Sequence, residues 1–365
     1  MRRVIPILIL LGTFAPGLSW GADESKAKRE FGLLMDGMRD ARERLRSGIY
    51  RATGRLAVKT PTAGLADGDC VLFCAFDDDK HWFRFDREQP VKLPDAESKV
   101  DDDKPRQLVL RQMAGKFART PEQTVYWDTD SANLTVSSPS DVSVLLGLVH
   151  PFDVRTIGLL GWSGYQINTA FSDILQVLTS QKIISIISDG PSIFHITELF
   201  GEADFARRDL WIDANRGYSP IRLELRYKLQ SGIAEEWPAP TVVSESTWNK
   251  TGEVWVPATF TFDEGTNSPH SVHQQLQFEW QSVNAPVDEQ FFEPEGFDVD
   301  PDTIIVDRRL GKPIIIGKVG DPDYEPPPPF AVAPNGNTWN SKIVVAVAVV
   351  LLAIGIAWYR KRQAS

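Results

Sequence analysis

The stretch LWIDANRGYSPIRLE, residues 210–224, decides the fold class, because it places a tight turn between two strand-like runs. The runs cover residues 208–213 and 221–228 and are rich in apolar and aromatic side chains. The turn, residues 214–217, holds asparagine and glycine, which are typical turn formers. The stretch therefore predicts an antiparallel β-hairpin.

The same alternation of strand-like run and turn extends over most of the chain. Asp77-Asp78-Asp79-Lys80 forms a four-residue hairpin loop, and turns of similar composition cover residues 249–252 and 264–267. Many strands joined by short turns predict an antiparallel meander, which we expect to curve into an open half-barrel. The predicted strands are 49–59, 70–76, 81–86, 107–113, 124–128, 134–137, 182–188, 192–197, 208–213, 221–228, 242–248, 254–263 and 271–282, with an edge strand at 303–306.

Two amphipathic helices accompany the predicted strands. Residues 25–46 carry apolar side chains at helical spacing, and Gly48 follows as a stop signal. Residues 170–180 repeat the pattern with Phe171, Ile174, Leu175 and Leu178. We expect both helices to pack on the sheet, so the fold class is mainly β within α+β. Residues 95–105 are highly charged and predict an exposed loop.

The N-terminus has the pattern of a secretory signal peptide, residues 1–22. Arg2 and Arg3 precede an apolar stretch from Val4 to Leu18, and small residues follow it. Cleavage after Gly21 and cleavage after Ala22 both fit this pattern. The apolar stretch is shorter than the roughly 20 residues that a membrane span needs, which argues against an uncleaved anchor.

The C-terminus predicts a membrane anchor. Residues 343–359, from Ile343 through Leu351 to Tyr359, hold no charge and would form a helix of about 26 Å, near the lower limit for a span. Trp358 and Tyr359 suit the membrane interface, and the basic cluster Arg360, Lys361 and Arg362 keeps the tail 360–365 cytoplasmic. Residues 311–342 include four consecutive prolines and predict a stiff stalk. Residues 23–310 are then a periplasmic ectodomain held at the inner membrane by a single span.

Charge and cysteine content narrow the function further. A net charge of −10 excludes nucleic acid as the expected partner, because binding to phosphates needs clustered basic residues. Cys70 and Cys74 fall in one predicted strand. Four residues of strand separate their Cα atoms by about 13 Å, too far for a disulfide. We expect two buried free thiols, no metal site and no cofactor.

The sequence contains no complete catalytic motif. Gly161-Trp162-Ser163-Gly164 lacks the second glycine of a nucleophile elbow, because Tyr165 stands in its place. Tryptophans in strand-like runs stand out instead, and two interpretations compete: they fill a core, or they line an apolar ligand cavity. The cavity candidates are Trp82, Trp127, Trp211, Trp248, Trp255 and Trp280.

The layout of signal peptide, amphipathic helix and long meander resembles the periplasmic lipoprotein-carrier (LolA-like) superfamily. Residues 210–213 with 217–224 look like that superfamily's characteristic hairpin, and residues 248–257 look like the next one. Residues 291–294 resemble its closing segment. The resemblance covers roughly residues 25–300 and implies a half-barrel, lidded by helices, that binds an acyl chain without catalysis. The stalk and the anchor depart from the soluble carriers.

The expected function is therefore non-enzymatic binding of a lipid or a lipoprotein acyl chain by a membrane-anchored envelope domain. The alternative is an envelope scaffold or protein-interaction domain with a filled β core and no ligand. The sequence does not identify a protein partner.

Overall fold

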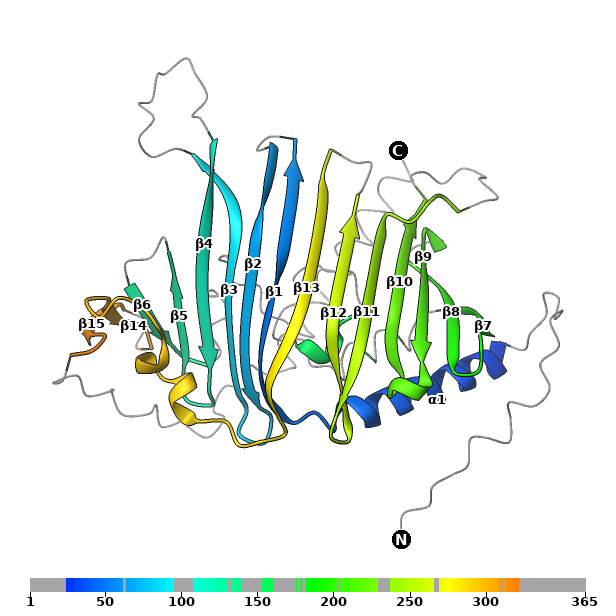
Figure 1. Cartoon of the computed structure of the whole chain (residues 1–365), viewed down its shortest axis with the longest axis horizontal. Coiled ribbons are helices and arrows are strands. Elements are labelled where there is room, and N and C mark those ends of the chain that lie inside the picture. Colours follow the sequence, from blue (N-terminus) through cyan, green and yellow to red (C-terminus); the bar gives the residue numbers. More distant parts are fainter. Residues whose placement is uncertain are drawn as a thin grey trace, which may run out of the picture. The chain divides into compact units, whose positions relative to one another are not determined.

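One large sheet dominates the part of the chain that the computed structural model describes, namely residues 24–61, 64–94, 108–129, 133–139, 153–159, 175, 178, 182–201, 204–228, 237–265, 269–309 and 312–321. It has fifteen strands and is open, because the edge strands β7 and β15 do not pair with each other (Figure 1). The strand order is β15-β14-β6-β5-β4-β3-β2-β1-β13-β12-β11-β10-β9-β8-β7.

The strands follow the predicted ones closely and are mostly longer. Their bounds are β1 Ser47–Thr60, β2 Gly64–Asp77, β3 Trp82–Pro94, β4 Leu108–Arg119, β5 Thr124–Asp128, β6 Asn133–Ser137, β7 Lys182–Ser188, β8 Ile193–Phe200, β9 Ala206–Asp213, β10 Ser219–Tyr227, β11 Val242–Thr251, β12 Val254–Glu264, β13 Ser271–Val283, β14 Ile304–Asp307 and β15 Ile314–Lys318. The predicted hairpin at residues 210–224 is confirmed as the pair β9–β10.

Two antiparallel arms meet at the centre of the sheet. One arm runs from β1 to β6 in chain order and the other from β7 to β13, and β1 pairs antiparallel with β13 along its length (Figure 1). The close pairing depends on Gly54, because a Cβ atom there would lie 1.7 Å from the carbonyl oxygen of Gln275. The β1–β13 pairing therefore joins the two arms into one continuous, open sheet.

The meander prediction fails at one edge. β14 pairs with β6 in parallel, and β15 adds a strand beyond β14. The chain reaches this edge because residues 286–300 cross the outer side of the sheet, where Arg84 donates to the carbonyl oxygens of Phe291 at 2.9 Å and Gly296 at 2.8 Å. β15 lies within the segment assigned above to the stalk, so the sheet extends beyond residue 310.

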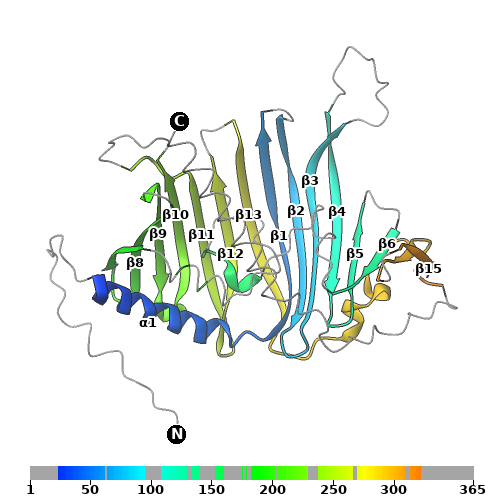
Figure 2. The ribbon, with the colours of Figure 1, turned by 180° about the vertical axis from the view of Figure 1, so that it is seen from behind.

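Helix α1, Glu24–Arg42, crosses the strands of the second arm near one end of the sheet and contacts β7 and β12 (Figure 2). Its apolar stripe is buried as predicted, at Phe31, Leu34, Met35 and Met38. The helix ends four residues before the predicted limit of residue 46. A tightened turn, with the Leu45 N–H donating to the Arg42 carbonyl at 3.0 Å, lets Leu45 enter the core.

The sheet has two distinct faces. The core face carries the main apolar cluster, which extends from Phe117 on β4 across the sheet to Ile183 on β7. The outer face carries two smaller clusters over β2–β6, covered by residues 286–300. Leu175 and Leu178, from the predicted second helix, are buried in the main cluster. Cys70 and Cys74 are buried there as free thiols, which confirms the prediction.

Candidate functional site

The six candidate tryptophans lie on both faces of the sheet. Trp248, Trp255 and Trp280 belong to the core face or pack against its cluster. Trp82 and Trp127 pack against the outer clusters, and Trp211 alternates with the core residues Leu210 and Ile212 and so faces outward. Only the first three are therefore placed where a ligand of the core face could meet them.

Trp248 and Trp255 lie near the end of α1, and the indole N–H groups of Trp248 and Trp280 are hydrogen-bonded. The indole N–H of Trp248 donates to the Pro220 carbonyl at 2.8 Å, and that of Trp280 donates to the Pro257 carbonyl at 3.0 Å. Trp255 packs beside Gly217, whose φ of +64° and tight contact with the Trp255 ring leave no room for a Cβ atom. The N–H groups of Trp248 and Trp280 are therefore already used, and all three rings contribute apolar surface to the core face.

Several ionisable groups are buried on the core face. Burial raises the pKa of the Cys74 thiol and of the Tyr50 phenol, so both stay neutral. Burial also raises the pKa of Glu198, against the opposing effect of its ion-pair partner Arg208. Burying a polar group among apolar side chains costs free energy unless the group is paired. These ionisable positions therefore distinguish parts of the core face from ordinary apolar packing.

Arg42 is the most isolated of these groups. It is 2% exposed, and its guanidinium carbon lies 3.8 Å from the centroid of the Trp248 ring. Burial lowers its pKa to about 9, Asp153 opposes the shift and Arg155 adds to it. Within the described structure, its Nε and Nη2 atoms have no hydrogen-bond partner.

Residues 153–159 cover the core face near Arg42. Val154, Ile157 and Leu159 are buried in the main cluster. Arg155 holds this segment in place, because it donates to the Asp153 carboxylate at 2.6–2.9 Å and pairs with Asp78 in the loop after β2. The segment is therefore tied to the β2–β3 hairpin.

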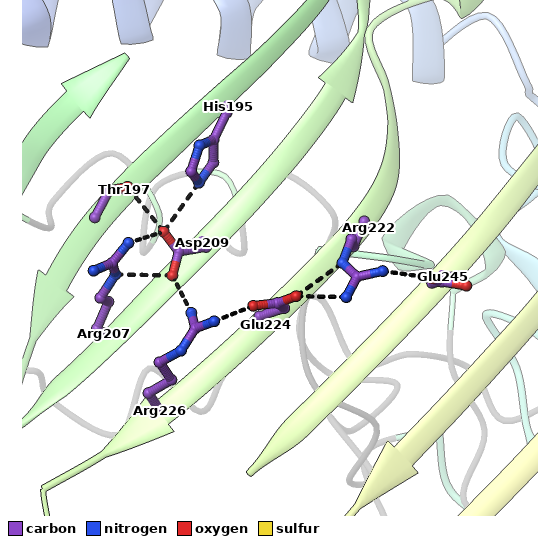
Figure 3. Close-up of polar contacts among 8 residues, drawn as sticks. All are labelled: His195, Thr197, Arg207, Asp209, Arg222, Glu224, Arg226 and Glu245. Carbon is purple, nitrogen blue, oxygen red and sulfur yellow. Dashed lines mark hydrogen bonds and ion pairs between the residues drawn. The ribbon is translucent and has the colours of Figure 1, made fainter. Parts of the chain in front are cut away.

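On the outer face, a polar network links four neighbouring strands. It starts at Asp209 on β9, whose side chain is 1% exposed, and ends at Glu245 on β11 (Figure 3). The Asp209 carboxylate accepts from His195 at 3.0 Å, from Thr197 at 2.9 Å and from Arg207 at 2.7–2.8 Å. His195 also stacks on Trp211, with ring centroids 4.2 Å apart.

The second half of the network is formed by arginine bridges. Arg226 joins Asp209 to Glu224, and Arg222 joins Glu224 to Glu245. Burial alone would raise the pKa of the Asp209 carboxyl, but hydrogen bonds from His195, Arg207 and Thr197 outweigh burial and hold that pKa well below its usual range. Three arginines balance three carboxylates here, so the network is suited to holding strands together rather than to binding a further ion.

Part of this arrangement is visible in the sequence. Arg207 and Asp209 share one side of their strand, as do Arg222, Glu224 and Arg226, because side chains alternate along a strand. Spacing alone does not show that the two strands are neighbours, which is what brings Arg226 to Asp209. Arg42 gives no signal, because an arginine at the end of a helix is typical of an exposed position.

Other predictions fall where the structure offers no description. The signal peptide (1–22), the charged loop (95–105), the elbow-like segment (161–165) and the anchor with its tail (343–365) lie outside the described residues. Among the helices that are described, none is both long and apolar enough to cross a membrane. The same residues contain no group of three or more side chains suited to hold a metal ion.

Comparison with known proteins gives a likeness in fold. No protein-family model matches this chain, and no curated protein matches its sequence. Among solved structures, a domain from Vibrio parahaemolyticus assigned to outer membrane lipoprotein sorting is 11% identical, with 74% of this chain and 97% of that one covered and a TM-score of 0.38. A LolA superfamily protein from Nitrosomonas europaea is 8% identical, with 73% and 98% covered and a TM-score of 0.34.

A third structure, a DUF1329 family protein from Desulfovibrio piger, is 11% identical over 75% of this chain and 99% of that one, with a TM-score of 0.37.

Proposed function

We propose that this protein is a non-enzymatic envelope protein that binds the acyl chain of a lipid or lipoprotein against the core face of its sheet. Residues 1–22 export it, and residues 343–359 anchor it in the inner membrane with the sheet on the periplasmic side. The protein therefore holds its ligand at a fixed membrane rather than carrying it freely between membranes.

The width of the core face is the observation that supports this proposal. One apolar cluster extends from β4 to β7, and the described elements that cover it are α1, residues 153–159, Leu175 and Leu178. A hydrocarbon chain removed from water by such a face gains about 0.8 kcal/mol for each buried CH₂ group. The sequence resemblance to lipoprotein carriers points in the same direction.

A filled-core scaffold is the second candidate, and one observation favours it. At the centre of the sheet, Tyr50 is fully buried and packs on Trp280 and Phe278, with ring centroids 4.9 and 5.5 Å apart. Such packing leaves no space for an acyl chain at that point. A ligand would therefore lie toward β7–β12, beneath α1.

Native mass spectrometry of the full-length protein extracted from membranes separates the two candidates. Acyl-chain binding predicts a population heavier than the mature polypeptide by the mass of one acyl lipid, which organic solvent removes. A single species at the polypeptide mass, together with no binding of an added fluorescent fatty acid, would support the scaffold.

The anchor is tested by truncation. Deleting residues 340–365 should release the protein from the membrane into the periplasmic fraction, because residues 343–359 form the one stretch of the mature sequence long and apolar enough to span. A deletion of residues 360–365 alone serves as the control and should leave the protein in the membrane. Retention of the longer deletion in the membrane would show that the anchor is wrongly placed.

A further inference from the structure

Many arginine side chains in the described structure pair with acidic residues, and one arrangement recurs. Five of them dock the edge formed by Nε and Nη2 onto a carboxylate two residues away, with donor–acceptor distances of 2.6–3.2 Å. This edge carries two parallel N–H groups that match the two oxygens of a carboxylate or phosphate. The pairs are Arg84–Asp86, Arg155–Asp153, Arg207–Asp209, Arg222–Glu224 and Arg309–Asp307.

Arg42 does not have this pairing with a carboxylate two residues away, although it is more deeply buried than most of these arginines. Its Nε and Nη2 atoms, which form the same edge, are unpartnered within the described residues. The acidic residue two positions away, Asp40, cannot reach this edge, because residues two apart point to different sides of a helix. The ordinary local partner is therefore excluded by the secondary structure.

Asp153, the nearby acidic residue, does not serve as the missing partner of Arg42. Asp153 is the carboxylate whose charge acts on Arg42, but it is engaged by both Nε and Nη2 of Arg155. Trp248 covers one face of the Arg42 guanidinium, so a hydrogen-bond partner would have to meet the buried edge formed by Nε and Nη2. The site thus combines a buried cation, an aromatic wall and an apolar sheet.

We propose that Arg42 binds the oxyanion at the head of the acyl ligand, a carboxylate or a phosphate, through two parallel hydrogen bonds from Nε and Nη2. This assignment rests on the proposed function, because the acyl chain would occupy the adjoining core face. It adds that the ligand is an anionic amphiphile whose head lies inside the protein at the end of α1, rather than a neutral lipid whose head remains in water.

The test compares three amphiphiles of equal chain length on the full-length protein: a fatty acid, a lysophosphatidic acid and the neutral fatty alcohol. The variant Arg42→Gln keeps a polar, unbranched side chain, although a shorter one, and removes the charge. Arg39→Gln is the matched control, because Arg39 is exposed on the last turn of α1 and pairs with Asp36. Fluorescence displacement measures each affinity, and near-ultraviolet circular dichroism verifies the fold of each variant.

Arg42→Gln should weaken binding of an anionic amphiphile about 10–100-fold, the worth of hydrogen bonds to a charged group, and leave alcohol binding unchanged. If binding of the fatty acid is weakened more than binding of the lysophosphatidic acid, the natural head group is a carboxylate; if the reverse holds, it is a phosphate. Arg42→Lys keeps the charge without the paired edge and should recover only part of the loss.

Equal losses for alcohol and anions, or no loss for either anion, would overturn the assignment while leaving acyl binding intact. If the wild-type protein binds none of the three amphiphiles, the proposed function itself fails.

Discussion

The outer-face network and the surroundings of Arg42 differ in whether their buried charges have hydrogen-bond partners within the described structure. Around Asp209, four donor residues surround one carboxylate, and one of them, Arg226, is shared with Glu224. Around Arg42, a guanidinium is just as buried but lacks hydrogen bonds at two of its N–H-bearing atoms. The charged groups of the first region satisfy one another, whereas the Arg42 guanidinium has unused donors for a further partner.

This difference separates stabilising charges from functional ones. Buried charges that are paired and hydrogen-bonded are compatible with a stable fold. When one member is removed, the others remain buried without a partner, which is strongly destabilising. An unpaired buried charge lowers stability and persists only where something else requires it. The two regions should therefore respond to mutation with opposite signs.

Asp209→Ala should have the largest effect. Removing the carboxylate leaves Arg207 and Arg226 without their central partner, so the free energy of unfolding should fall by about 3–5 kcal/mol. Urea denaturation measures the change. Glu245→Gln is the control at the exposed end of the network, where the side chain is 54% exposed and the cost should stay below about 1 kcal/mol. Similar losses in both variants would mean that burial does not set the value of these pairs.

Arg42→Met should act in the opposite direction. Burial holds the pKa of Arg42 near 9, below its value of 12.5 in water, so at neutral pH the charged form costs the folded state free energy. Replacing the cation by an apolar side chain of similar length should raise the free energy of unfolding of the ligand-free protein by about 1–4 kcal/mol. Arg39→Met, on the exposed side of α1, should change stability little. Destabilisation by Arg42→Met alone would place Arg42 with the structural charges.

Acid titration sharpens the comparison with a smaller effect. The pKa of Asp209 is lower in the folded state than its ordinary value of 3.8, so its contribution to stability is complete above that value and is lost as the pH falls below it. The difference in unfolding free energy between wild type and Asp209→Asn should therefore be constant from pH 7 to about 5 and shrink below about 4. A difference that shrinks already at pH 6 would contradict a lowered pKa for Asp209.

Much of the fold follows from local sequence patterns. The strands, the turn at residues 214–217 and the apolar stripe of α1 are each determined by neighbours a few residues apart, and each is found where it was predicted. β15 and the parallel pairing of β14 with β6 depend on the path of residues 286–300 across the sheet, which local patterns do not contain.

The site is harder to predict for the same reason. Aromatic content alone does not separate Trp248, on the core face, from Trp211, on the outer face, because the side depends on strand register. Arg42 stands out only when its burial and its missing partners are known. Sequence patterns led us to expect an acyl-binding face, and the described structure adds Arg42 as a buried cation on that face.

Photocrosslinking tests the central claim most directly, because the two faces carry different aromatic residues. Full-length protein in membranes would be labelled with a diazirine fatty acid, and the adducts located residue by residue with tandem mass spectrometry. We predict adducts on core-face residues of β11 and β12, such as Trp248, Phe260 and Phe262, that excess unlabelled fatty acid prevents. Adducts on Trp211 or Trp127 of the outer face instead, or labelling that no competitor reduces, would contradict acyl binding at the core face.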